Sequence, residues 1–174
     1  MFSIPSPLHP AVVHFPIVLL LLGCAVAIVA AFTRRWHLPL LGAVLLMLGA
    51  AGAVVSVSTG EREGELVGET AGSVLDEHED WAERTRTAAL VAAALGIAAV
   101  AVGRMPRTAR ALGACTAIAA AGASWCVVET GHRGGQLVYR HGAGVLAAGG
   151  TATNPGADGK AASPARVDRD RDDD

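Results

Sequence analysis

Four long apolar segments, separated by polar and charged residues, dominate the chain. They run over about residues 11–32, 38–59, 87–103 and 109–131, and we expect the helix that carries the third to begin near residue 76. A helix needs about 20 apolar residues to cross the hydrocarbon core of a bilayer, and each segment meets or approaches that length. The pattern therefore predicts an all-α protein, an integral membrane four-helix bundle.

The chain changes character after the fourth segment. Residues 131–150, GHRGGQLVYRHGAGVLAAGG, are too few and too rich in glycine to span a bilayer. We interpret them as a turn followed by a short C-terminal helix, re-entrant or interfacial, that lies back on the bundle. From Thr151 onward the sequence lacks apolar periodicity, which is typical of disorder. We predict a four-helix transmembrane domain over 1–150 and a disordered tail over 151–174.

Composition agrees with a membrane protein and limits its chemistry. The chain is 52% hydrophobic with a net charge of −2, which is too apolar for an ordinary soluble domain. Its three cysteines, Cys24, Cys115 and Cys126, lie inside apolar segments. An odd number at such positions argues against a disulfide framework, and the sequence contains no CxxCH motif for covalent haem attachment.

The distribution of charge predicts the orientation in the membrane. Acidic residues gather in the segment between the second and third apolar segments, over residues 60–80. Two short loops join the first apolar segment to the second and the third to the fourth. They carry arginine and no acidic residue, at Arg34, Arg35, Arg104, Arg107 and Arg110. Because loops rich in Lys and Arg stay in the cytoplasm, we expect a multi-pass protein of the cell membrane whose N- and C-termini both face outward.

Small residues repeat along two of the apolar segments. The second segment carries Gly42, Gly49 and Ser56 at heptad spacing with Gly52 beside them, and the fourth carries Gly113, Ala117, Ala121 and Ser124. One interpretation is close packing between helices through small residues. The other is a groove for a flat cofactor, which also requires small residues, and the sequence does not separate the two.

Histidines gather at one end of the predicted bundle. His37 belongs to an arginine-bearing loop, whereas the other five map to the outer end: His9, His14, His78, His132 and His141. At 1.5 Å of rise per residue, His14, His78 and His132 lie within about 10 Å of one another in depth. His141 reaches the same level if the chain folds back through a turn at Gly131, Gly134 and Gly135.

A layer of imidazoles is a candidate cofactor site. Neutral imidazole is a common metal ligand, and two imidazoles from facing helices are the usual way in which a bundle holds a b-type haem. Arginine suits the haem propionates, and Arg84, Arg86, Arg133 and Arg140 lie near that end. Glu129 either fixes a histidine tautomer, or takes part in proton transfer, or pairs with Arg133 four residues later. In the competing interpretation, the histidines are interfacial side chains satisfied by water and nearby acids.

Three stretches of sequence resemble a known family. They are LHPAVVHFPI at 8–17, HEDW at 78–81 and GHRGGQLVYRHG at 131–142. With them, residues 8–145 resemble the bacterial four-helix membrane proteins grouped as domain of unknown function 2231. Members are similar to domains fused to Rieske-type or c-type cytochrome modules, which implies membrane electron transfer with b-type haem. The family's histidines fall here on His9, His14, His78, His132 and His141.

The main hypothesis is a membrane-embedded electron-transfer protein with haem b near the outer face. The iron ligands are expected among His14, His78, His132 and His141, with one haem or two. His9, Arg133 and Arg140 are expected to contact the cofactor, and His9 alternatively caps its helix. Expected partners are the lipid bilayer, a redox protein or quinone, and a second copy of the chain, but not nucleic acid.

Two alternatives remain open at this point. The same imidazoles suit a non-haem metal such as copper or zinc. A structural or interaction protein without a cofactor also accounts for the pattern, and the sequence does not decide whether the protein is an enzyme.

Overall fold

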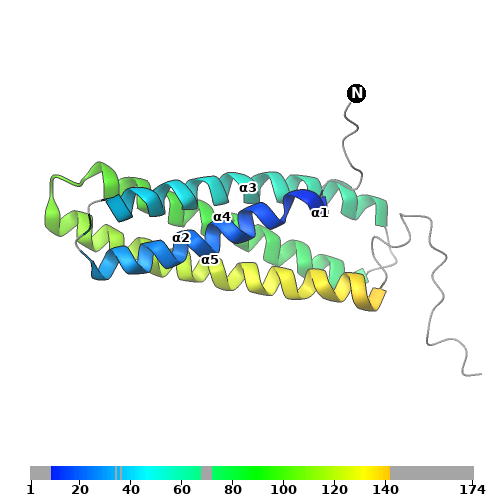
Figure 1. Cartoon of the computed structure of the whole chain (residues 1–174). Helices are drawn as coiled ribbons and strands as arrows, with labels where there is room; N and C mark the ends of the chain where they lie inside the picture. Colours follow the sequence, from blue (N-terminus) through cyan, green and yellow to red (C-terminus); the bar gives the residue numbers. More distant parts are fainter. Residues whose placement is uncertain (1–8, 34, 36, 68–71, 142–174) are drawn as a thin grey trace, which may run out of the picture.

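The computed structural model describes residues 9–33, 35, 37–67 and 72–141, and its regular elements within that part of the chain are all helices. The elements are α1 (His9–Val12), α2 (His14–Phe32), α3 (His37–Val67), α4 (Gly72–Ala101) and α5 (Pro106–His141) (Figure 1). Helices α2 to α5 are each long and apolar enough to cross a membrane. The predicted fold class, an all-α membrane four-helix bundle, is confirmed.

The four long helices run alternately up and down, and each packs against the next one in the sequence. Helix α5 also packs against α2, which closes the ring. Helices α2 and α4 therefore lie diagonally opposite and run in the same direction. The beginning of α1 and the end of α5 lie at the same end of the bundle (Figure 1).

Glycine allows α2 and α3 to approach closely. A Cβ atom built on Gly49 would lie 2.9 Å from Leu20 Cδ2, and one built on Gly23 would lie 2.9 Å from Leu46 Cδ2. Leu20 and Leu46 thus fill the space that each facing glycine leaves, and both side chains are fully buried. On α3 the small residues serve helix packing, which is the first of the two interpretations given above.

On α5 the predicted face of small residues is rotated away from the core. Ala121 is exposed, and a Cβ atom on Gly113 would meet no other atom within 4 Å. The face that packs inward is made instead by Thr116, Ala120, Ala123 and Val127. Because alanine or glycine occupies about half of the positions in 109–131 and lies on every side of the helix, small residues alone do not identify its buried face.

The predicted turn at 131–135 is wrong, because α5 continues as one helix to His141. Each glycine costs a helix about 1 kcal/mol relative to alanine, and here packing against α4 outweighs that cost. Gly134 lies against His78, and Leu137 is buried one turn further on. The expected short C-terminal helix beyond residue 141 and the expected tail over 151–174 lie outside the described residues.

The acidic segment is also more helical than expected. Helix α3 extends to Val67, and α4 begins at Gly72 rather than near residue 76. Glutamate is a good helix former once a helix has been nucleated, so both helices continue beyond their apolar parts. Gly72 has a φ of +48°, a conformation that suits glycine at the start of α4.

Pro16 separates α1 from α2. Proline has no N–H to donate to the Val12 carbonyl, and its ring crowds that carbonyl. The helical assignment is interrupted at Val13, although Val13 keeps right-handed dihedral angles and its N–H still donates to the His9 carbonyl at 3.0 Å. Pro16 thus disturbs the beginning of the first span, and His9 lies on a separate short turn, α1.

The two helix hairpins, α2–α3 and α4–α5, share one pattern of burial. Each buried residue of α2 has a buried counterpart in α4. The two members of each pair are as far apart in the sequence as His9 and His78. These pairs are Pro16 and Thr85, Leu20 and Ala89, Gly23 and Ala92, Cys24 and Ala93, and Ala27 and Gly96. Helices α3 and α5 correspond likewise, through Gly42 and Thr116, Leu46 and Ala120, Gly49 and Ala123, and Ala53 and Val127. The bundle therefore has an approximate internal two-fold symmetry.

Candidate functional site

The imidazole of His9 is held against α3. Its Nδ1 lies 2.9 Å from the Ser56 carbonyl oxygen and 3.3 Å from Thr59 Oγ1. Gly60 gives the ring its space, because a Cβ atom there would lie 3.1 Å from His9 Cε1. The ring is half-buried. Although His9 precedes the first apolar segment, its side chain belongs to the interface between helices.

The imidazole of His78 is held against α5 in the same way. Its Nδ1 lies 3.0 Å from the Thr130 carbonyl oxygen, and a Cβ atom on Gly134 would lie 3.1 Å from His78 Cε1. One turn further into the bundle, the hydroxyls of Thr85 and Thr130 lie 2.9 Å apart and join α4 to α5. This ring is half-buried as well.

These contacts fix the tautomer of both rings. A carbonyl oxygen only accepts hydrogen bonds, so Nδ1 of His9 and Nδ1 of His78 must each carry a hydrogen and donate it. In a neutral ring the lone pair then lies on Nε2. This is the usual arrangement of a metal-binding histidine, whose second nitrogen donates to a carbonyl or carboxylate that orients the ring.

Both rings lie at the same depth in the bundle. Gly96 packs against Ala43 and Thr116 and so defines a common layer across α3, α4 and α5. Distances along each helix can be counted from that layer at 1.5 Å of rise per residue. Gly60 lies about 26 Å from Ala43 on α3. His78 lies about 27 Å from Gly96 on α4, and Gly134 about 27 Å from Thr116 on α5. The sequence prediction placed His14, His78 and His132 in one layer. Of these, His78 lies level with His9 and packs between helices, whereas His14 and His132 are exposed.

A buried hydroxyl without a partner lies beside the His9 contact. Ser56 is 7% exposed, and its Oγ has no hydrogen-bond partner among the described residues. A buried hydroxyl is costly unless it is paired. Separately, two imidazoles whose lone pairs lie on Nε2 are a donor set that could hold a haem iron.

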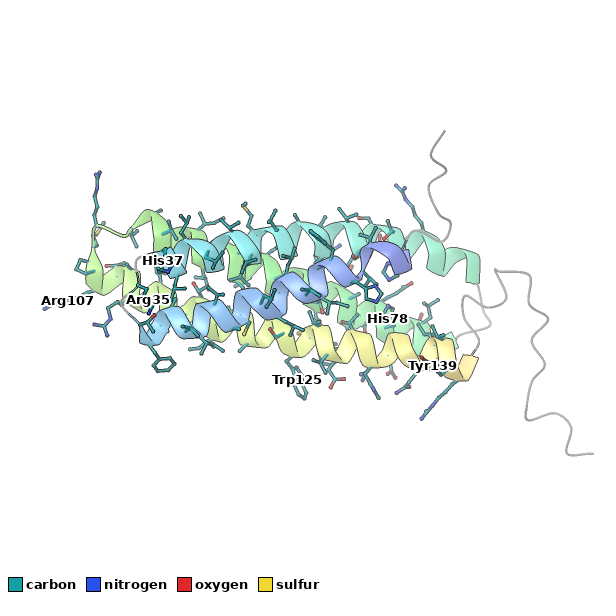
Figure 2. All side chains as sticks on the ribbon, viewed as in Figure 1. Arg35, His37, His78, Arg107, Trp125 and Tyr139 are labelled. Atoms are coloured by element: carbon teal, nitrogen blue, oxygen red, sulfur yellow. The ribbon has the colours of Figure 1, made fainter. Side chains whose placement is uncertain are left out.

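The remaining histidines do not join this pair. His14 and His132 are exposed, and the Gln136 amide donates to His132 Nε2 at 2.8 Å. His141 ends α5, about 10 Å beyond Gly134 along the helix, because the turn that was expected to bring it back is absent. Figure 2 shows His37 with Arg35 and Arg107 at the end of the bundle opposite to His78 and Tyr139.

The guanidinium of Arg133 forms ion pairs with two acidic side chains of the same chain. Its guanidinium donates to Glu129 Oε2 at 2.6 Å and to Glu77 Oε2 at 3.1 Å, and it lies 5.3 Å from the centre of the Trp81 ring. The expected pairing of Glu129 with Arg133 is confirmed. The guanidinium of Arg84 also lies over the Trp81 ring, at 4.9 Å. Arg140 is exposed in the last turn of α5.

The described residues contain no group of three or more His, Cys, Asp or Glu side chains that could hold a metal ion. A shallow open groove on α4, lined by Asp80, Glu83, Arg84, Thr87 and Ala88, lies apart from both imidazoles. Ser56, Gly60, Thr130 and Gly134 support the rings but were missed as site residues in the sequence. One sequence signal could have identified these four residues. It is a glycine four residues after a serine or threonine, on a helix that faces a histidine.

The fold and the distribution of apolar residues define a multi-pass integral membrane protein of the four-helix type. Residues 5–147 match the family described as "Predicted membrane protein (DUF2231)". The chain belongs to this family, which confirms the resemblance drawn from its three sequence motifs. No curated protein and no solved structure matches the chain.

Proposed function

We propose that the protein is a membrane-embedded electron-transfer protein that holds one b-type haem by His9 and His78 at the outer end of the bundle. The observation that supports this most directly is the shared geometry of the two rings. Each donates from Nδ1 to a carbonyl of a neighbouring helix, α3 for His9 and α5 for His78, at the same depth, so that Nε2 is the basic nitrogen of both. His14, His132 and His141 are less suited as ligands because of their exposure or position.

The number of available ligands favours haem over a non-haem metal. Zinc sites use three or four protein ligands, and copper sites likewise draw on several imidazole or sulfur ligands. The described residues gather no such group. A haem iron takes four nitrogens from its own macrocycle and needs only two axial ligands from the protein, which matches a pair of imidazoles.

In this proposal each side chain has a definite task. His9 and His78 bind through Nε2, while the Ser56 and Thr130 carbonyls keep each ring in one tautomer and orientation. Haem supplies reversible one-electron exchange at its iron. Arg140, which is exposed, is the arginine expected to reach a propionate, since Arg133 already pairs with Glu77 and Glu129.

The position of the pair along the bundle suggests where electrons enter or leave. Arg35 and Arg107 mark the end that the positive-inside rule assigns to the cytoplasm, and His78 lies at the other end (Figure 2). Trp125, which is 61% exposed, lies about 13 Å nearer the arginine end than Gly134. Exposed tryptophan favours the membrane–water interface. The site then lies at the outer edge of the bilayer of the cell membrane, within reach of a redox protein or a quinone.

The test is the absorption spectrum of the full chain, expressed with a supply of haem and purified in detergent. The expected result is a Soret band with sharp bands on reduction, as a low-spin iron with two histidine ligands gives. His9→Ala and His78→Ala should each abolish that low-spin signature, whereas His14→Ala and His132→Ala should keep it. A wild-type protein without a Soret band contradicts the proposal, and stoichiometric copper or zinc in its place favours the alternative metal site.

A further inference from the structure

Each of the two histidines occupies a seat with the same construction. The seat consists of a backbone carbonyl that accepts from Nδ1 and of a glycine four residues further along the same helix. For His9 these are Ser56 and Gly60 on α3, and for His78 they are Thr130 and Gly134 on α5. The internal two-fold symmetry of the bundle relates one seat to the other, although the hairpins share little sequence there.

The glycines are the part of each seat where a side chain would press against the imidazole. A Cβ atom on Gly60 would lie 3.1 Å from His9 Cε1 and 3.3 Å from Nδ1. On Gly134 it would lie 3.1 Å from His78 Cε1 and 3.4 Å from Nδ1. Both distances to Cε1, and the distance from Gly60 to Nδ1, are shorter than ordinary van der Waals contacts, which begin near 3.4 Å. A methyl group would therefore displace the ring by a few tenths of an ångström, away from the carbonyl that orients it.

We infer that Gly60 and Gly134 are positioning residues of a single two-imidazole site, which takes one haem per chain. The choice of haem rests on the function proposed above, whereas the construction of the two seats does not. Each hairpin contributes one seat at one depth. Two other histidines at the outer end have described side chains. They are His14 and His132, and both are exposed. Among the described side chains, the two seats thus provide two axial ligands, the number that one haem iron needs.

The position of the glycines supplies a matched control. Gly135 follows Gly134 on α5, and Gly131 precedes it by three residues, yet a Cβ atom at either control position would meet no other atom within 4 Å. All of these positions belong to one helix and experience the same change in helix propensity when replaced by alanine. Only Gly134→Ala changes the contact with His78.

The first measurement uses the full-length protein without haem, in detergent, and records the ¹⁵N signals of the histidine rings. Gly134→Ala should move the His78 ring away from a single Nδ1–H tautomer while leaving His9 as in the wild type. Gly60→Ala should do the reverse. Gly131→Ala and Gly135→Ala should change neither ring. Unchanged signals of both histidines in the Gly60 and Gly134 variants overturn the assignment of the seats.

The second measurement is a haem titration of the same proteins. The wild type should saturate at one haem per chain. Loss of a supporting contact to a metal-binding residue commonly weakens binding by 10- to 100-fold, so Gly60→Ala and Gly134→Ala should each bind haem at least about tenfold more weakly, unlike Gly131→Ala and Gly135→Ala. Saturation at two haems overturns the single site. If the wild type binds no haem but the ring signals respond as described, the proposed function fails and the positioning role stands.

Discussion

The two hairpins of the bundle solve the same packing problem with different residues. In α2–α3, Leu20 and Leu46 fill the space beside Gly49 and Gly23. In α4–α5 the four equivalent positions are all alanine, and each is 0% exposed: Ala89, Ala120, Ala123 and Ala92. Lipid provides no hydrophobic driving force between helices, so close packing must hold them together. The comparison shows that close packing depends on the combined volume of the two facing residues. It does not require a glycine at any particular position.

The largest effect is expected from emptying the leucine–glycine packing of the first hairpin. Leu46 is 0% exposed and lies against Gly23. Leu46→Ala leaves a cavity there and should lower the free energy of unfolding by about 2 to 5 kcal/mol, as measured by denaturant titration in mixed micelles. Leu48→Ala is the control, because Leu48 is 44% exposed. Equal losses for both variants would show that Leu46 has no special role in packing.

A double substitution sharpens the comparison, because it gives the first hairpin the residues of the second. Gly49→Ala places a Cβ atom 2.9 Å from Leu20, and such overpacking should cost about 1 to 3 kcal/mol. Adding Leu20→Ala makes room for the new methyl group, so the loss for the double variant should be smaller than the sum of the two single losses. Strict additivity would mean that the two positions do not share one space.

The smallest effect concerns the polar contacts one turn inside the seats. Thr85→Val removes the hydroxyl that lies 2.9 Å from Thr130 Oγ1, and hydrogen bonds between membrane helices are worth about 0.6 kcal/mol on average. Ser56→Ala removes a hydroxyl without a partner, so it should be neutral or slightly stabilising in the protein without haem. A loss for Ser56→Ala as large as that for Thr85→Val, in the same unfolding assay, would show that the Ser56 hydroxyl is paired in the membrane.

Much of the fold follows from apolar segments that are long enough to span. The helices, their number and the layer of histidines are predictable because membrane-spanning segments leave few other structures for the chain. The continuation of α5 is not predictable in this way. Gly131, Gly134 and Gly135 are typical of a turn, yet Gly134 is needed where it lies because the His78 ring covers it. A contact between residues so distant in sequence leaves no local signal.

For the candidate site, the sequence predicts that histidines are involved and how deep in the bundle they lie. It does not predict which histidines are brought together. His14 and His9 are five residues apart, and the prediction favours His14 as a ligand because it lies inside the apolar segment. Five residues turn a helix by about 140°, so His9 faces Ser56 while His14 is exposed. Helical rise gives the depth of a residue without its rotation around the helix, and rotation decides which rings meet.

An even number of membrane crossings has a practical consequence. His9 and His141, the outermost described residues, both lie at the end of the bundle that carries the imidazole seats (Figure 1). Any domain tethered through either flank, whether natural or added by protein engineering, is therefore delivered to the same membrane surface as those seats. A soluble electron carrier fused at one flank and a reporter fused at the other would then both lie on the side of the membrane that carries His9 and His78.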